Sequence, residues 1–161
     1  METVTINIYT IKELTDERAK ERARDCYRNG MEYHWLDESL DSIKTFCEHF
    51  GVTLKAWEVG AYLSPYFSTD AENSHFRGLK VSQFKPDHMP TGYCLDWPLW
   101  STFFHEFKRN GDAKAAFVEA LHEGFKCWCA DLEDQNSDEY IDEHLEANGY
   151  TFTEDGKRFN A

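Results

Sequence analysis

The chain contains no apolar run that approaches the ~20 residues needed for a membrane-spanning helix. Its first ten residues, METVTINIYT, lack a basic segment followed by a long apolar one, so we expect no secretory signal peptide. Cysteine is scarce and odd in number, with five residues that do not have the spacing of a disulfide scaffold. Reduced thiols are typical of the cytosol, and these absences together predict a cytoplasmic protein.

The motifs of common enzyme classes are also missing. The chain has no Gly-rich phosphate loop and no G-x-S-x-G nucleophile turn, and its seven histidines show no metal-ligand spacing. Cys127 and Cys129 are two residues apart, which on a helix directs them roughly 200° apart, so they cannot hold one ion together. We therefore expect no catalytic residues, no metal site and no cofactor, and an enzyme with an unrecognised site is our third hypothesis.

The pattern of apolar residues predicts an α+β fold. With 161 residues and no repeat, low-complexity segment or linker, we expect a single domain over residues 1–161. Caps and apolar periodicity predict about five helices, which run from about 15 to 30, 36 to 50, 96 to 110, 112 to 135 and 137 to 148. Alternation and turn residues predict a small, mainly antiparallel sheet of about four strands, with candidates near 4–8, 52–59, 62–67, 75–81 and 150–153.

Basic residues are absent from one long acidic segment. Residues 131–155 contain ten carboxylates and no Lys or Arg, whereas residues 1–130 hold 20 acids and 15 bases. The net charge of the whole chain is −13, so this segment carries most of it. Acidity opposes direct binding to nucleic acid, because phosphates are repelled, but it favours binding to the basic surfaces that normally hold nucleic acid.

The last predicted helix concentrates this charge. Five of its acids span nine residues, which at ~1.5 Å of rise per residue averages roughly one charge per ~3 Å of axis. One DNA strand presents a phosphate every ~3.4 Å, so the helix has a similar linear charge density. The candidate partner-binding residues are Asp131, Glu133, Asp134, Asp138, Glu139, Asp142, Glu143 and Glu146. A solvated acidic face is the alternative interpretation.

Two other surfaces bear on recognition. The first predicted helix is rich in Arg and Lys, which can pair with acids of their own helix. We favour a solvated amphipathic face for these residues, and a head-to-tail or two-fold assembly with the acidic segment is the alternative. Core packing is the expected role of most aromatic residues. Tyr62 and Tyr66, with Ser64 and Ser68 between and beside them, are candidates for the mixed polar and aromatic surface that interfaces use.

Both ends of the chain resemble a group of small bacteriophage and prophage proteins. The resemblance is carried by residues 13–24 (ELTDERAKERAR), 32–35 (EYHW) and 147–158 (ANGYTFTEDGKR). Proteins of this group commonly bear the label "antitoxin of toxin–antitoxin stability system". Their Gly-rich centre is replaced here by residues 61–76, AYLSPYFSTDAENSHF. The resemblance implies a mobile-element origin and a bacterial host cell.

Three functional hypotheses follow. The first is a phage-encoded inhibitor, of the anti-CRISPR or anti-restriction type, that docks its acidic surface on a basic site of a host defence protein or nucleoprotein complex. The second is an antitoxin that neutralises a partner toxin by direct binding. The third is the unrecognised enzyme, which a pocket of carboxylates or histidines with perturbed pKa values would reveal.

Overall fold

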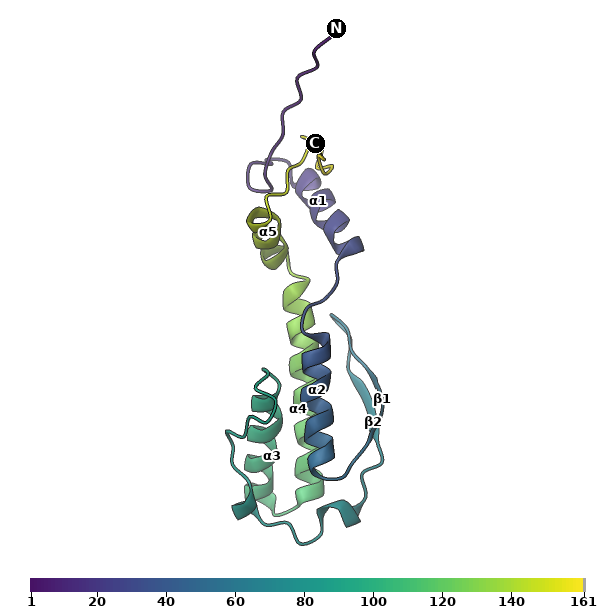
Figure 1. The fold of residues 1–161 in the computed structure, drawn as a ribbon, viewed down its shortest axis with the longest axis vertical. Coiled ribbons are helices and arrows are strands. Elements are labelled where there is room, and N and C mark those ends of the chain that lie inside the picture. The colour runs from purple at the N-terminus through teal and green to yellow at the C-terminus, as the bar shows by residue number, and fades with distance from the viewer. Residues whose placement is uncertain (161) are drawn as a thin grey trace. The chain divides into compact units, whose positions relative to one another are not determined.

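The computed structural model describes residues 1–160, whose contacts group into two compact units. The first unit comprises Met1–Tyr33 together with the chain from Asp134 onward, and the second comprises His34–Glu133. Both appear in Figure 1, and each is described by itself below. The class is α+β, with five α-helices and a small antiparallel sheet in the described residues, but the sheet has two strands and not about four.

The second unit contains most of the regular elements. In chain order they are α2 (Leu36–His49), β1 (Leu54–Glu58), β2 (Tyr66–Thr69), the 3-10 helices η1 (Asn73–Phe76) and η2 (Val81–Gln83), α3 (Asp96–Asn110) and α4 (Ala113–Gln135), whose last two residues belong to the first unit. The predicted end of α3 and start of α4 are confirmed, because both depend on local capping. The backbone N–H of Ala115 donates to the carboxylate of Asp112 at 3.0 Å, and α3 ends at Gly111 in the left-handed conformation.

Aromatic rings fill the core of this unit. The Phe46 ring of α2 stacks on Phe117 of α4, with 5.3 Å between centroids, and meets Trp100 of α3 edge-on at 4.9 Å. The apolar stripe of α4 is buried, and its members are Phe117, Leu121, Phe125, Trp128 and Leu132. Gly124 lets the helices approach, because a Cβ there would lie 2.5 Å from Leu99 and 3.2 Å from Ile43.

The sheet is a two-stranded hairpin that packs against α4. β1 and β2 are antiparallel, with Trp57 opposite Phe67, and the Phe67 ring stacks on Phe125 of α4 at 4.9 Å. A third strand over residues 75–81 was a wrong prediction. This segment runs instead from the end of η1 to the start of η2, because the Glu72 and His75 side chains close a capping box and Gly78 takes a φ of +72°.

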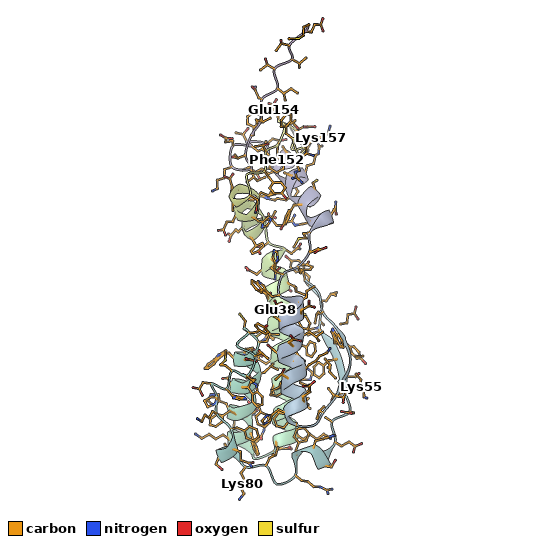
Figure 2. All side chains as sticks on the ribbon, in the orientation of Figure 1. Glu38, Lys55, Lys80, Phe152, Glu154 and Lys157 are labelled. Carbon is orange, nitrogen blue, oxygen red and sulfur yellow. The ribbon has the colours of Figure 1, made fainter. Side chains whose placement is uncertain are left out.

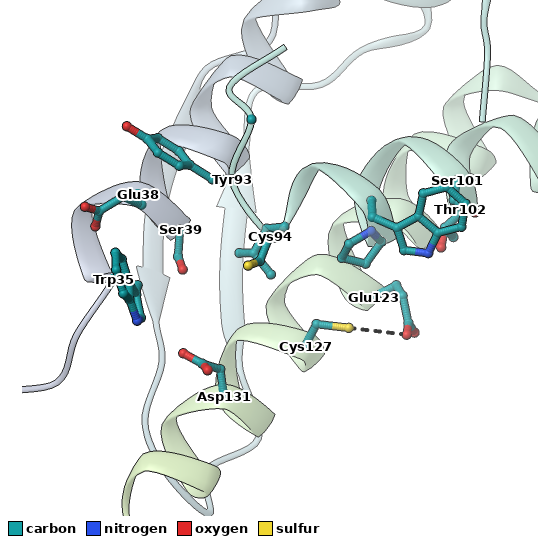
Figure 3. Close-up of a pocket in the computed structure, with 14 residues that line it drawn as sticks. Trp35, Glu38, Ser39, Tyr93, Cys94, Ser101, Thr102, Glu123, Cys127 and Asp131 are labelled. Carbon is teal, nitrogen blue, oxygen red and sulfur yellow. Dashed lines mark hydrogen bonds between the residues drawn. The ribbon is translucent and has the colours of Figure 1, made fainter. Parts of the chain in front are cut away.

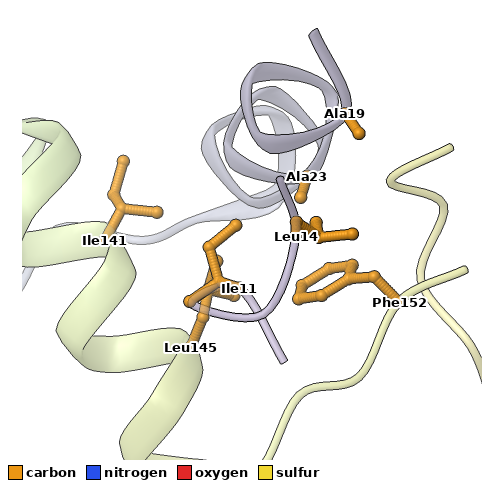
Figure 4. Packing of buried hydrophobic residues seen from close by; sticks show 7 residues of the cluster. All are labelled: Ile11, Leu14, Ala19, Ala23, Ile141, Leu145 and Phe152. Carbon is orange, nitrogen blue, oxygen red and sulfur yellow. The ribbon is translucent and has the colours of Figure 1, made fainter. Parts of the chain in front are cut away.

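The first unit consists of two helices and short extended segments. α1 (Glu17–Gly30) is capped by Asp16, and α5 (Asp138–Ala147) is capped by Ser137. The buried cluster between them, shown in Figure 4, contains Ile11, Leu14, Ala19, Ala23, Ile141, Leu145 and Phe152.

The predicted first strand is not formed. Val4, Ile6 and Ile8 are exposed, and pairing is limited to a bridge between Tyr9 and Phe152. The short candidate at 150–153 forms only this bridge and a second one from Phe152 to Arg158. An alternating sequence needs a neighbouring strand of matching length to hide its apolar side, and the described residues supply none.

The turn at the C-terminal end of the first unit packs tightly on α1. It carries Glu154 and Lys157, which are labelled with Phe152 in Figure 2. Gly156 has a φ of +82°, and a Cβ at this position would lie 2.0 Å from the carbonyl oxygen of Ala19. Only glycine fits both requirements. Across residues 1–160, no helix combines the length and apolarity needed to cross a membrane.

Candidate functional site

The predicted acidic segment is divided between the two units. Asp131 and Glu133 belong to the second unit, whereas Asp134 and the five acids of α5 belong to the first. The first unit has 15 acids and 8 bases, and the second has 15 acids and 9 bases, so their net charges are −7 and −6. Eight of the ten carboxylates of the acidic segment therefore lie in the first unit, but the bases of that unit bring its net charge close to that of the second.

Arg24 of α1 neutralises part of the acidic helix. Its guanidinium donates to both carboxylate oxygens of Asp142, at 2.8 and 2.7 Å, and to Asp138 at 3.3 Å. The Arg24 side chain is only 12% exposed. The hydrogen bonds to Asp142 raise the pKa of Arg24, although burial opposes this rise. This bidentate pair ties α1 to α5.

Arg28 and Arg22 add to this internal pairing. Arg28 donates to Asp138 and to the carbonyl oxygen of Asn136, just before α5 begins. It also donates to Glu21 and Asp25 of its own helix at 3.2 Å. Arg22 donates to the Asp155 carboxylate at 3.3 Å. The basic residues of α1 thus meet both their own helix and the acidic segment, so Asp138 and Asp142 are paired with cations of the first unit.

Two more predicted residues serve as hydrogen-bond acceptors for the backbone. Glu146 accepts from the N–H of Lys12 at 3.2 Å, within the first unit. Glu133 accepts from the N–H of Tyr62 at 3.1 Å and so holds the loop between β1 and β2. Tyr62 itself has a φ of +63°, and its side chain is exposed, as is that of Tyr66. The aromatic surface predicted at this loop therefore faces outward.

Glu139 and Glu143 remain as the outward acids of α5. Both are exposed, and within residues 1–160 neither carboxylate has an ion pair or hydrogen bond. They are four residues apart and share one face of the helix. The helix is therefore not a uniform polyanion, because its carboxylates are divided between an outward pair and others that bind internally.

The sequence did not predict a groove in the second unit. This groove has a volume of about 610 Å³ and is lined by the start of α2, the chain from Gly92 to Thr102, and one face of α4. Figure 3 shows Trp35 and Glu38 on the α2 side and Glu123, Cys127 and Asp131 along α4. These three α4 residues are four apart, a spacing that places them on one helix face and that sequence reasoning could have used.

The groove holds acids and aromatic rings but no base. Its charged residues are Glu38, Glu123 and Asp131, and no Lys, Arg or His lines it. Three large aromatic side chains on its walls are exposed: Trp35 at 64%, Trp97 at 55% and Tyr93 at 41%. Trp35 also has a φ of +66°, a conformation that costs a non-glycine residue on the order of 1 kcal/mol or more.

A buried carboxylate fixes one wall of the groove. Asp96, the first residue of α3, is fully buried and accepts hydrogen bonds from the N–H of Gly92 at 2.8 Å and from the N–H and hydroxyl of Thr91 at 2.9 Å. The Thr91 hydroxyl also lies 3.0 Å from that of Ser42 on α2. These contacts lock the loop that carries Tyr93 to the start of α3 and to the middle of α2.

The Cys127 thiol of the groove is not arranged for nucleophilic chemistry. Cys127 donates a weak hydrogen bond to Glu123, with 3.6 Å between sulfur and oxygen. Burial raises the pKa of Cys127, and the negative charge of Glu123 raises it further. The thiolate is the nucleophilic form, so this environment suppresses reactivity. No group of His, Cys, Asp and Glu within the described residues is arranged to hold a metal ion.

Comparison with known proteins yields no relative. The chain matches no family model, no curated protein sequence and no solved structure. Its function must therefore be inferred from its own side chains.

Proposed function

We propose that this protein is a non-enzymatic, protein-binding inhibitor that docks outward carboxylates on a basic, nucleic-acid-binding surface of a partner. The observation that carries the proposal is the outward pair Glu139 and Glu143, which no cation neutralises in the described residues. The net negative charge of both units supports it, because each would be attracted to a basic surface.

Because Asp138 and Asp142 are paired internally, fewer carboxylates of α5 can imitate the phosphates of a nucleic acid than the sequence suggests. Residues four apart on a helix are separated by ~6 Å along its axis. Phosphates of one DNA strand are spaced ~3.4 Å apart, so Glu139 and Glu143 match alternate phosphates and not every phosphate. A basic surface with cations at this wider spacing is the expected contact. Association should be fast at low salt and weaken as salt screens the charges.

The resemblance of both ends to phage proteins supports a finer proposal about the partner. A phage or prophage protein in a bacterial cytoplasm meets host defence systems, whose restriction and CRISPR complexes hold nucleic acid on basic surfaces. We propose that such a complex, of protein or nucleoprotein, is the target.

The test is charge reversal with a position-matched control. Glu139→Lys with Glu143→Lys reverses the outward pair at the second and sixth positions of α5. Asp37→Lys with Asp41→Lys makes the same charge change at the second and sixth positions of α2, on exposed residues that do not line the groove. Both helices keep their buried faces, so both double variants should fold.

The wild-type protein and both variants would be used to capture partners from a host lysate at 50 and 500 mM salt, and the captured complex would then be assayed for nucleic-acid binding. We expect the wild type and the α2 variant to displace nucleic acid and the α5 variant to lose at least tenfold in potency. Equal potency of the two variants would contradict the proposal.

A different assay distinguishes the antitoxin hypothesis from the defence-inhibitor proposal. Antitoxins with a folded DNA-binding part carry a basic patch, but in α1 the guanidinium groups of Arg22, Arg24 and Arg28 are held by carboxylates. Direct capping of a toxin is the form of this hypothesis that remains. Co-expression with the neighbouring gene, scored by growth rescue, would identify it, because a defence inhibitor rescues phage infection and not growth.

A further inference from the structure

We infer that a small cavity of the second unit, separate from the groove, is a binding site for a small oxyanion of the phosphate class. The cavity has a volume of about 240 Å³ and is lined by His49, Gln83, Phe84, Lys85, His88 and Trp100. These residues come from the end of α2, the chain that includes and follows the end of η2, and the first half of α3. The site does not depend on the function proposed for Glu139 and Glu143, which belong to the other unit.

The charge of the cavity favours an anion. Its lining includes one lysine and two histidines but no Asp or Glu, in a unit whose net charge is −6. Lys85 is exposed and has no ion pair in residues 1–160, so its ammonium group is available to a ligand. Glu48 and Asp87 are the nearest acids in the sequence, and neither lines the cavity. The cavity is therefore a local exception to the acidity of its unit.

Two further side chains of the lining have donors without acceptors. Trp100 is 1% exposed, and its buried indole N–H has no hydrogen-bond acceptor in the described residues. Buried donors are nearly always paired, so this group calls for a partner. The side-chain oxygen of Gln83 accepts from the N–H of Lys80 at 2.7 Å, which leaves the amide NH₂ of Gln83 to donate. A tetrahedral oxyanion accepts several hydrogen bonds at once and can serve such donors together.

The two histidines supply charge that depends on pH. Their ring centroids lie 6.2 Å apart, and both rings meet Trp100 edge-on, His49 at 4.9 Å and His88 at 4.6 Å. Burial lowers the pKa of His49, and the positive charge of His88 lowers it further. The other rings that meet His49 are those of Phe50 and Phe84, which do not titrate. A bound anion stabilises the imidazolium form, so binding should tighten as the pH falls.

Size and ligand set distinguish a small anion from other occupants. The volume lies below the ~300–1,000 Å³ of pockets for drug-sized ligands and equals roughly eight waters at ~30 Å³ each. Lys85 would repel a metal ion, and the described residues contain no group of three His, Cys, Asp or Glu arranged to hold one. The rings of Phe84 and Trp100 form a low-dielectric wall, which strengthens the attraction between Lys85 and an anion.

The test is a titration of the ¹⁵N-labelled full-length protein at constant ionic strength, with sodium chloride as the balancing salt. The probes are sulfate, phosphate and phenyl phosphate, and the readout is the indole N–H signal of Trp100. Sulfate keeps two charges between pH 6 and 8, so its pH dependence reports on the protein alone. We expect a saturable shift of the Trp100 signal and about tenfold tighter sulfate binding at pH 6 than at pH 8. The indole of Trp57, on β1 outside the cavity, is the internal control and should not shift.

Variants locate the site. Lys85→Gln should weaken sulfate binding at least fivefold. Lys108→Gln is the matched control, because Lys108 is an exposed lysine of the same unit outside the cavity, and it should leave the affinity unchanged. The double variant His49→Gln with His88→Gln should bind sulfate equally at pH 6 and pH 8. Trp100→Phe assigns the indole signal and should weaken binding about threefold. Thermal melts would show that each variant is folded.

The inference is overturned by any of three results. These are no saturable shift of the Trp100 signal with 100 mM sulfate, a shift of equal size with chloride alone, or equal losses in Lys85→Gln and Lys108→Gln. Phosphate and phenyl phosphate distinguish the sources of the group. Tighter binding of phenyl phosphate would assign the site to a phosphate monoester, and tighter binding of phosphate to the free ion. Charge reversal at Glu139 and Glu143 should leave sulfate binding unchanged, so the two proposals can fail separately.

Discussion

Replacing Arg24 with methionine should loosen the first unit while leaving the second unit intact. Arg24 donates two hydrogen bonds to Asp142 and one to Asp138, and its side chain is mostly buried. Methionine preserves much of the apolar stem but removes the charge. The variant therefore leaves Asp142, whose side chain is 27% exposed, without its principal partner.

The loss of unfolding free energy in Arg24→Met lies between two known limits. Exposed ion pairs contribute about 0–1 kcal/mol, whereas hydrogen bonds to charged groups contribute about 1.5–3 kcal/mol when their loss leaves a partner unsatisfied. The Asp142 pair is close to the second limit and the Asp138 contact is close to the first. We expect Arg24→Met to lower the free energy of unfolding of the first unit by about 2–3 kcal/mol.

The assay must resolve the two units. All five tryptophans lie between residues 35 and 128, so tryptophan fluorescence reports on the second unit alone. Hydrogen exchange of peptides from α1 and α5, analysed by mass spectrometry, reports on the first unit. Protection there should fall about 30- to 150-fold, the equivalent of 2–3 kcal/mol, while the urea midpoint from fluorescence stays constant.

Two companion variants test the reasoning. Arg18→Met removes an exposed guanidinium that has no ion pair in residues 1–160 and should change stability by less than ~0.5 kcal/mol. The double variant Arg24→Met with Asp142→Leu removes both charges and should recover part of the loss, because an apolar pair can replace a buried ion pair. Unchanged protection in Arg24→Met, or an equal loss in Arg18→Met, would refute the role assigned to this pair.

Three further predictions concern single side chains. Gly156→Ala should destabilise the first unit by about 3 kcal/mol or more, through its positive φ and its clash with α1, whereas Gly149→Ala, with positive φ but open space, should cost about 1–2 kcal/mol. Hydrogen bonds from Thr153 and Lys157 lower the pKa of Asp155 to about 2. Because the unfolded value is ~3.9, the stabilisation from Asp155 is present above pH ~4 and lost as the pH falls toward 2. Asp155→Asn should therefore flatten the acid limb of a circular dichroism titration. Asp96→Ala leaves three donors of the groove loop unsatisfied, and tryptophan fluorescence in urea should show a loss of about 2–4 kcal/mol.

The helices could be predicted because their signals are local. Asp112 and Ser137 cap helices whose first amide groups lie within three residues, and Gly111 ends α3 through its own backbone conformation. The strands were predicted less well. Alternation at Val4, Ile6 and Ile8 shows only that one face is apolar, and a strand forms only where a second segment pairs with it. The same limit explains the failed strand at 75–81.

The acidic segment shows that a candidate site, like a strand, depends on partners that are distant in the sequence. Its charge could be counted along the chain, but the residue that neutralises Asp142 is 118 positions away. Sequence reasoning allowed the arginines of α1 to meet these acids, yet it could not say which carboxylates would be paired. The groove was missed for a similar reason, since its walls come from three separate segments.

By itself, then, the sequence determined the five helices, the apolar stripe of α4, the acidic character and the α+β class, because caps, periodicity and composition act within a few residues. Tertiary structure alone decided which carboxylates remain exposed, that Trp35, Trp97 and Tyr93 border an acidic groove, and that the sheet stops at two strands. Each of these outcomes depends on contacts between segments far apart in the chain, and the energy of such a contact exists only after both segments have been placed.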